Sequence, residues 1–210
     1  MSDTIDRIIA AEWQMFDQVR GTAGRAPCQD DLRSFVRERG SQFAAWDEPL
    51  RASYEADLAQ AARQGRNLLM EKYAFMAERS APEEFRRMET LLPGRSPRKR
   101  QMVDALAKTM CAWQREVARR WPHLTARGRN LQSTQDRPDN VSFESYLRGE
   151  LATYSEATLA EYLRYTAALS ARGENLCENI LARSVRSSGY RDLEEAEREL
   201  IRRSNRKDPR

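Results

Sequence analysis

The amino-acid sequence predicts an all-α protein, a compact bundle of about ten helices. Apolar residues recur at helical spacing along nearly the whole chain, and the alternating pattern of β-strands is essentially absent. Glycine, proline and capping residues separate the periodic stretches. A hydrophobic content of 40% beside a charged content of 32% suits helices with one solvated face. At 210 residues the chain can bury one substantial core, so we expect residues 1–210 to form a single globular domain.

The sequence pattern of the first half of the chain, residues 5–92, predicts five helices. An apolar stripe from Ile5 to Val19 predicts the first helix, which glycines end. Asp47, followed by Glu48-Pro49, is a favourable N-cap with proline in the first turn. The other boundaries follow from the same signals: a second helix after Asp30 or Asp31, a third from Asp47 to Gly65, a fourth over 66–78, and a short fifth between Ser80 and Leu92.

The second half follows a linker, Pro-Gly-Arg-Ser-Pro-Arg, at residues 93–98. A long helix is expected over about 98–121, ended by Pro122, and the stretch 122–140 is the longest irregular one. The remaining helices are expected over about 142–154, 155–172 and 174–187, and residues 188–210 should form a C-terminal helix with a basic tail.

The two halves share short sequences in the same order. The recurring pieces are Trp13-Gln14 with Trp113-Gln114, Gly24-Arg25 with Gly128-Arg129, Gln29-Asp30 with Gln135-Asp136, Ser34-Phe35 with Ser142-Phe143, Tyr54 with Tyr162, and Gly65-x-Asn67-Leu68 with Gly173-x-Asn175-Leu176. The offset grows from 100 to 108 and then stays constant. This pattern predicts an internal duplication, with repeats at 5–92 and 98–187 related by an approximate two-fold axis and a cleft where they meet.

Several longer motifs resemble those of a known bacterial family. They are Glu12-Trp13-x-Met15-Phe16, Cys28-Gln29-Asp30-Asp31, Ser41-Gln42-Phe43-x-x-Trp46, Gly65-Arg66-Asn67-Leu68, Lys72-Tyr73, and the stretch from Ser142 to Ser155. Over about residues 5–195 the chain resembles the family known as domain of unknown function 4125. The resemblance implies a compact, cytoplasmic bacterial domain and implies no particular activity or cofactor.

Two carboxylates lie within apolar stripes of the predicted helices. Glu12 is four residues from both Ile8 and Phe16, and Glu150 is four residues before Tyr154. Gln42 occupies the position of Glu150 in the first repeat. Burial can raise the pKa of a carboxyl and suit it to proton transfer, so Glu12 and Glu150 are the candidate catalytic residues. The alternative is that each pairs with an arginine and fixes the packing, the candidates being Arg25, Arg39, Arg129 and Arg148.

Other repeated polar residues are candidates for binding a ligand. They are Gln29, Gln42, Gln135, Asn67, Asn175, Arg25, Arg129, Tyr54 and Tyr162. Amides beside a helix N-terminus and arginines near turns can receive an anion or carboxylate. The alternatives are helix capping for the asparagines and a place in the core for the tyrosines.

Reactive and metal-binding motifs are scarce. Cys28 precedes a predicted helix N-terminus, which lowers a thiol pKa, but the single histidine, His123, lies in the long loop. The three cysteines form no C-x-x-C and no Glu-x-x-His is present, so we expect no metal site. The cofactor stays undetermined.

The net charge of +4 is concentrated in two basic runs, residues 95–100 and 202–210. Neither run is interleaved with aromatic residues, so we expect a solvated linker and terminus rather than a nucleic-acid site. No signal peptide or membrane-spanning run is present, which predicts a cytoplasmic protein without a membrane partner. The oligomeric state stays open.

These observations favour a protein that binds a polar small molecule in the cleft between the two halves. A ligand that bears a carboxylate group is one option. The expected chemistry is acid–base catalysis by Glu12 and Glu150, although whether the protein is an enzyme stays open. The alternative is a non-enzymatic helical interaction module with an exposed apolar groove. The first hypothesis predicts that Gln42, Glu150, Glu12, Gln29 and Gln135 surround one polar cavity, with Asn67 and Asn175 nearby.

Overall fold

The computed structural model describes residues 3–20, 24–126, 128–137 and 140–207, and within these ranges it contains eleven α-helices and no β-strand. The α-helices are α1 (Asp3–Asp17), α2 (Leu32–Ala45), α3 (Glu48–Arg63), α4 (Leu68–Ser80), α5 (Pro82–Met88), α6 (Pro97–Arg120), α7 (Pro122–Thr125), α8 (Phe143–Thr153), α9 (Glu156–Ala171), α10 (Leu176–Ser187) and α11 (Leu193–Lys207). Three 3₁₀ turns join them: η1 (Pro27–Asp30), η2 (Glu89–Leu91) and η3 (Ser133–Gln135). The predicted all-α class is confirmed.

Side-chain caps begin most of the helices, as the sequence pattern predicts. The carboxylate of Asp47 accepts the amide hydrogen of Leu50 at the start of α3, and Ser155 does the same for Thr158 at α9. The fourth helix begins at Leu68 rather than at residue 66, because Asn67 is its N-cap. The long irregular stretch after Trp121 is shorter than expected, since α7 and η3 lie within it.

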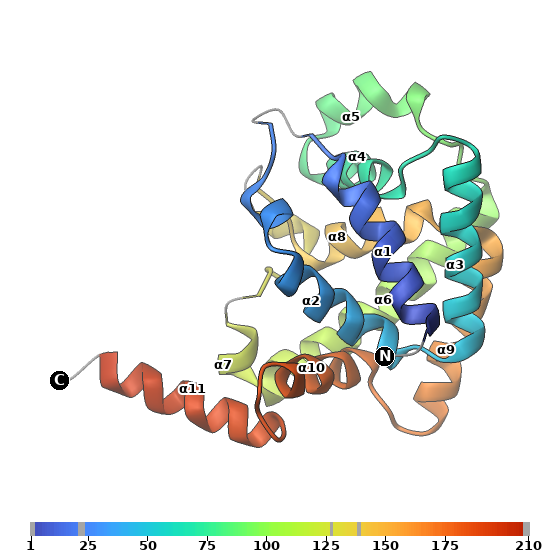
Figure 1. Ribbon diagram of the computed structural model, residues 1–210. Coiled ribbons are helices and arrows are strands. Elements are labelled where there is room, and N and C mark those ends of the chain that lie inside the picture. The colour runs from blue at the N-terminus through green and yellow to red at the C-terminus, as the bar shows by residue number, and fades with distance from the viewer. Residues whose placement is uncertain (1–2, 21–23, 127, 138–139, 208–210) are drawn as a thin grey trace.

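The helices of the two halves pack into one another (Figure 1). α2 lies against α10, and α4 lies against α8, so each pair joins one helix from each half. α3 and α9 run side by side, while α1 contacts three helices of its own half and α6 contacts four. The core therefore draws on both halves, with Phe43, Leu50, Leu106, Leu151 and Leu159 all fully buried.

Equivalent positions carry equivalent structure in the two halves. Gly65 and Gly173 have positive φ angles of 66° and 68°, which favour glycine at the ends of α3 and α9. Asn67 and Asn175 then cap α4 and α10. The pairing of α2 with α10 is the counterpart of the pairing of α8 with α4. These features support the duplication, which stays a prediction that superposition of the two halves in a crystal structure tests.

The last helix, α11, extends away from the body of the molecule (Figure 1). Its first turns pack against α7 and α10 through Leu193 and Ala196, both buried. None of the helices in the described ranges combines the length and the apolar character needed to cross a membrane.

Candidate functional site

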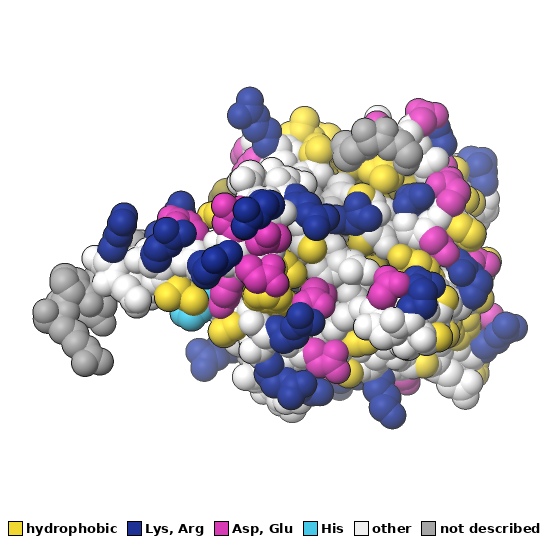
Figure 2. Space-filling model, turned by 90° about the horizontal axis from the view of Figure 1, so that it is seen from below, with side chains coloured by type: hydrophobic (Ala, Val, Ile, Leu, Met, Phe, Trp, Pro, Cys, Tyr) yellow, Lys and Arg dark blue, Asp and Glu magenta, His cyan; other side chains and the backbone are white. Residues whose placement is uncertain are grey.

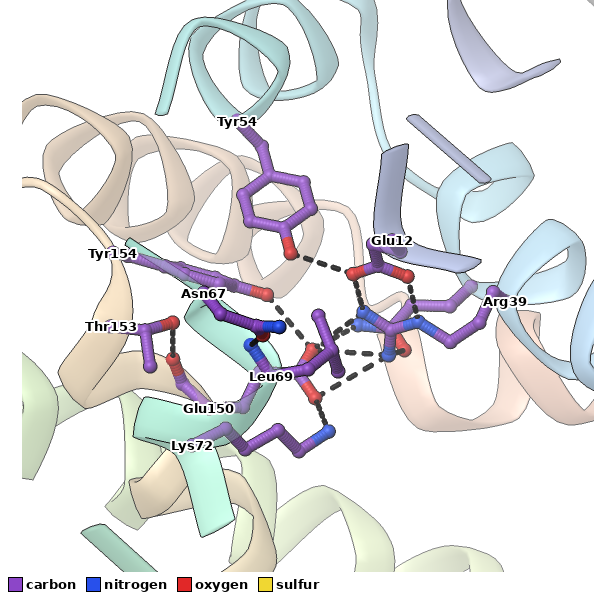
Figure 3. Close-up of polar contacts among 10 residues, drawn as sticks. Glu12, Arg39, Tyr54, Asn67, Leu69, Lys72, Glu150, Thr153 and Tyr154 are labelled. Carbon is purple, nitrogen blue, oxygen red and sulfur yellow. Dashed lines mark hydrogen bonds and ion pairs between the residues drawn. The ribbon is translucent and has the colours of Figure 1, made fainter. Parts of the chain in front are cut away.

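Arg39 of α2 lies at the centre of a buried polar network (Figure 3). Its guanidinium donates from Nε and Nη2 to the two carboxylate oxygens of Glu12 on α1, at 2.6 and 2.5 Å. Both side chains are nearly inaccessible to solvent, with exposed side-chain fractions of 9% and 0%. This bidentate pair is the geometry in which arginine binds a carboxylate most strongly.

Glu150 of α8 is the second carboxylate of the network (Figure 3). Arg39 donates to it from Nη1 and Nη2 at 3.2 Å, and the Lys72 ammonium of α4 donates to its other oxygen. The amide of Gln42 donates to it at 3.0 Å, and the hydroxyl of Tyr154 donates at 2.8 Å. Glu150 therefore accepts from four side chains and joins the second half of the molecule to the first.

Two carboxylates and two cations balance one another in this network. Burial raises the pKa of the Glu150 carboxyl, but the charges of Arg39 and Lys72 lower it by more and hold it well below its usual range. Burial and the nearby carboxylates hold the pKa values of the Tyr54 and Tyr154 hydroxyls well above their usual range. Glu150 is thus a carboxylate and both tyrosines are neutral donors at neutral pH, an arrangement unsuited to proton transfer by Glu150.

The network leaves few polar atoms without a partner. Tyr54 of α3 donates to Glu12 at 2.6 Å, and the carbonyl oxygen of Gln42 accepts from Arg39 at 2.7 Å. Among the described residues, the one buried side-chain nitrogen or oxygen without a hydrogen-bond partner is the indole nitrogen of Trp46, outside the network. The desolvation cost of burying these charges is therefore offset by pairing, which matches the packing alternative considered for Glu12 and Glu150.

The structure brings Glu12, Gln42 and Glu150 together, three of the five residues expected around one cavity, and adds Tyr54, but it places them around Arg39 rather than around an open space. Gln29 is buried elsewhere: its amide donates to the carbonyl oxygens of Phe16 and Val19, and its own oxygen accepts from the backbone of Ala26. Gln135 makes the corresponding backbone contact with Gln132 and is exposed. Both glutamines fasten turns and lie apart from the network.

Asn67 and Asn175 cap helices and tie them to a neighbour. Beyond capping, Asn67 donates to the carbonyl oxygen of Met15, and Asn175 donates to that of Trp113. Both asparagines are therefore helix caps, the alternative to ligand binding that the sequence offered, and neither hydrogen-bonds to the network.

The remaining arginine and tyrosine candidates take different places. Arg25 is exposed and pairs with Asp17 and Asp30. Arg129 donates to the carbonyl oxygen of Val141 and lies over the ring of Tyr146. Tyr162 is 2% exposed and packs against Trp46 in the aromatic core, at a centroid distance of 5.3 Å.

Lys72 and Tyr146 are members of the site that the sequence analysis did not single out. Lys72 is 3% exposed, and its ammonium lies 3.7 Å from the centroid of the Tyr146 ring. Lysine is rarely buried, so composition alone gave no reason to select it. Its spacing did indicate a buried position, because Lys72 is four residues after Leu68 and four before Met76 within an apolar stripe.

Two cavities adjoin the network on either side of Tyr146. The larger, of about 240 Å³, lies between α2, α4 and α8 and is lined by Phe16, Cys28, Asp31, Ser34, Phe35, Glu38, Arg39, Leu69, Lys72, Tyr73 and Tyr146. The smaller, of about 160 Å³, includes Gln42, Gln114, Glu150 and Tyr162 in its lining. Polar groups of the network thus form part of the walls of both cavities.

The larger cavity gives no support for cysteine catalysis. Cys28 is exposed at its edge, and none of the residues lining the cavity is a histidine. His123 instead lies against α11, where its Nδ1 is 2.8 Å from the carboxylate of Glu197. Within the described ranges, no group of three or more histidine, cysteine or acidic residues is placed to hold a metal ion.

Over residues 2–198 the chain matches the family described as "Protein of unknown function (DUF4125)". The chain belongs to this family. The resemblance drawn from the motifs is therefore confirmed. No curated protein and no solved structure matches the chain. Since the family description names no activity, the geometry of the site is the basis for a functional proposal.

Proposed function

We propose that this protein binds a small molecule carrying a carboxylate in the cavity of about 240 Å³ between α2, α4 and α8. The observation that carries the proposal is the position of Lys72, which lines the cavity and also belongs to the buried network. An ammonium has three N–H donors, and among the described residues Lys72 has one hydrogen-bond acceptor, Glu150. Donors are therefore left for an anionic group in the cavity.

Arg39 orients the site rather than binding the ligand. All of its nitrogen atoms already donate to Glu12, Gln42 or Glu150, so no donor is left for a further anion. Arg39 also donates to Glu150, the carboxylate that accepts from the Lys72 ammonium, and so holds that carboxylate in place. Burial lowers the pKa of Lys72, but Glu150 and Tyr146 together raise it by more, so the ammonium keeps its charge at neutral pH.

The rest of the cavity suits a compact ligand with an apolar portion. Phe16, Phe35 and Leu69 supply apolar wall, and the hydroxyls of Ser34 and Tyr73 supply hydrogen-bonding groups. The cavity volume lies below the range of about 300–1,000 Å³ typical of sites for drug-sized ligands, so the ligand should be a small metabolite. We place this binding in the bacterial cytoplasm, as the family resemblance implies. The proposal is for binding and includes no proton transfer by Glu12 or Glu150.

A thermal-shift screen of small carboxylic acids, each paired with its carboxamide, tests this proposal. We expect at least one acid to raise the melting temperature and its carboxamide to fail, because a neutral amide gains little from the ammonium. Calorimetric titration should then show binding that is lost in Lys72→Met with circular dichroism still helical. Lys108→Met, which removes an exposed lysine of α6, is the matched control and should bind normally.

A second variant keeps the test decisive if Lys72→Met fails to fold. Tyr73 is 38% exposed at the cavity, so Tyr73→Ala should keep the fold and weaken binding of the same acid. Acids that bind Lys72→Met and Tyr73→Ala as tightly as the parent protein would place the ligand elsewhere and overturn the proposal. A screen in which no carboxylic acid shifts the melting temperature would overturn it as well.

A further inference from the structure

A groove of about 630 Å³ lies between α2 and α10, on the side of α2 away from the buried network. Its floor includes a row of residues spaced one helical turn apart on α2: Leu32, Val36, Gly40 and Ala44. The cavity-facing residues of the same helix, Ser34, Phe35, Glu38 and Arg39, lie between these positions in the sequence. The groove is therefore separate from the proposed ligand site.

Four arginines stand along this groove: Arg33 and Arg37 on α2, and Arg183 and Arg186 on α10. No acidic side chain is among the described residues that line it. Arg37 pairs with Glu38, and Arg186 donates to the carbonyl oxygen of Arg191. Arg33 and Arg183 are exposed and have no ion-pair partner within the described ranges. Seen from below, several basic side chains lie in a row across the molecule, with acidic side chains beside the part of the row near the projecting helix (Figure 2).

We propose that this groove binds an acidic amphipathic helix of a partner protein. The floor from Leu32 to Ala44 is about 18 Å long at the rise of an α-helix, which matches roughly three turns of a docked helix. Apolar residues of the partner, at one-turn spacing, would cover the floor, while its glutamates and aspartates would meet the arginines on both sides. An apolar floor between two basic walls is the complement of an amphipathic helix with acidic flanks.

The shape of the groove distinguishes this occupant from other anionic ones. Val36 and Ala44 are only partly exposed within the groove, so a flat membrane surface can reach Leu32, which is 47% exposed, but not the rest of the floor. No aromatic side chain lines the groove, so the stacking surface that single-stranded nucleic acids use is missing from the described lining.

Fluorescence anisotropy with designed peptides tests the proposal on the full chain. The probe is a labelled helical peptide of about 14 residues, with leucines at one-turn spacing flanked by glutamates. Its controls are the same peptide with lysine in place of glutamate and a scrambled peptide of the same composition. We expect the acidic peptide to bind at least about tenfold more tightly than either control, with an affinity that falls as salt is raised.

Variants of the protein then locate the binding. Arg33→Glu combined with Arg183→Glu should weaken binding at least about tenfold, since it replaces attraction with repulsion at both walls. Arg115→Glu combined with Arg119→Glu, two exposed positions on α6, is the matched control and should leave the affinity unchanged. Leu32→Asp tests the floor and should also weaken binding, without removing a buried side chain.

Three results would overturn the proposal. The first is acidic-peptide binding no tighter than that of the scrambled peptide. The second is binding that survives the Arg33 and Arg183 reversals. The third is failure of the acidic peptide to bind while the protein attaches to vesicles containing phosphatidylserine, and loses that attachment in the variant with Arg33→Glu and Arg183→Glu. That result would assign the groove to a membrane surface. None of these results bears on Lys72, so this proposal and the proposed ligand site fail independently.

Discussion

At the scale of single residues, Arg39 determines whether the buried network is stable. Among the described residues it is the one side chain that donates to both Glu12 and Glu150, which come from helices in different halves of the molecule. Removing one member of a buried ion pair leaves its partner charged and desolvated, which is more costly than never having buried the pair. The contribution of Arg39 should therefore be much larger than that of an exposed arginine on the same helix.

Replacing Arg39 by methionine tests this expectation, since the apolar stem is largely kept and the guanidinium is lost. We expect Arg39→Met to lower the free energy of unfolding by about 3–5 kcal/mol, measured by urea denaturation. Arg33→Ala, at an exposed position on the same helix, is the control and should change it by no more than about 0.5 kcal/mol. Equal losses for the two variants would mean that the network adds little to stability.

Because of Glu150, we expect the free energy of unfolding to fall at acidic pH. Its pKa is lower in the folded protein than in the unfolded chain, so its stabilising contribution is present above the ordinary value of 4.5. The contribution is lost as the pH falls below that value towards the depressed pKa of the folded state. We expect urea titrations to show stability falling below about pH 4.5, and Glu150→Gln to be less stable at pH 7 with a smaller fall. Glu83→Gln, at an exposed pair on α5, should keep the slope of the parent protein.

At the scale of secondary-structure elements, the close contact of α4 with α8 explains how Lys72 reaches Glu150. Gly149 faces α4, and a Cβ at this position would lie 2.8 Å from the carbonyl oxygen of Lys72. A glycine here allows the two helix backbones to approach, and the adjacent Glu150 then meets the Lys72 ammonium. The sequence motif Gly149-Glu150 therefore combines a packing residue with a charged one.

Gly149→Ala should separate α4 from α8. We expect it to destabilise the protein by about 1–3 kcal/mol, because the backbone of α4 cannot yield as a flexible side chain would. Alanine's better helix propensity would act in the opposite direction by up to about 1 kcal/mol. Gly94→Ala in the linker has nothing within 4 Å of its added methyl group and should be neutral in the same thermal melt. A Gly149→Ala protein as stable as the parent would show that the helices separate freely.

Helix positions were predictable because periodicity and capping are local properties of the sequence. Asp47, Asn67 and Ser155 begin helices in the structure as their positions indicate. The choice among the arginines that could pair with Glu12 and Glu150 was not predictable. Arg39 is 111 residues from Glu150, and only the tertiary packing, with α4 against α8 and α2 against α10, brings Arg39 and Lys72 to the same carboxylate.

At the scale of the whole molecule, the packing of helices from one half against helices of the other implies that the protein unfolds as one cooperative unit. α2 needs α10 and α8 needs α4 to cover their apolar faces, so neither half can bury its own helices alone. The single domain expected over residues 1–210 follows from this interlocking and stays a prediction.

Expressing the halves separately tests it. A cut between Arg95 and Ser96 keeps the Arg95–Glu78 pair in one fragment and the Ser96 cap of α6 in the other. We expect neither fragment to melt cooperatively by circular dichroism, and a mixture of the two to recover a cooperative transition. As a control, removal of residues 189–210 should lower the melting temperature and keep the transition, because only α11 is lost. A cooperative melt of either half alone would contradict the prediction.

The contact of α2 with α10 also has a consequence for synthesis on the ribosome. The partner surface of α2 begins at Leu176, about 130 residues after α2 ends. At translation rates of about 5–20 residues per second, α2 emerges on the order of ten seconds before the helix that covers it. During that interval its apolar face is open to other nascent chains, so the slow arrival of the second half sets the time window in which this protein is most prone to aggregate.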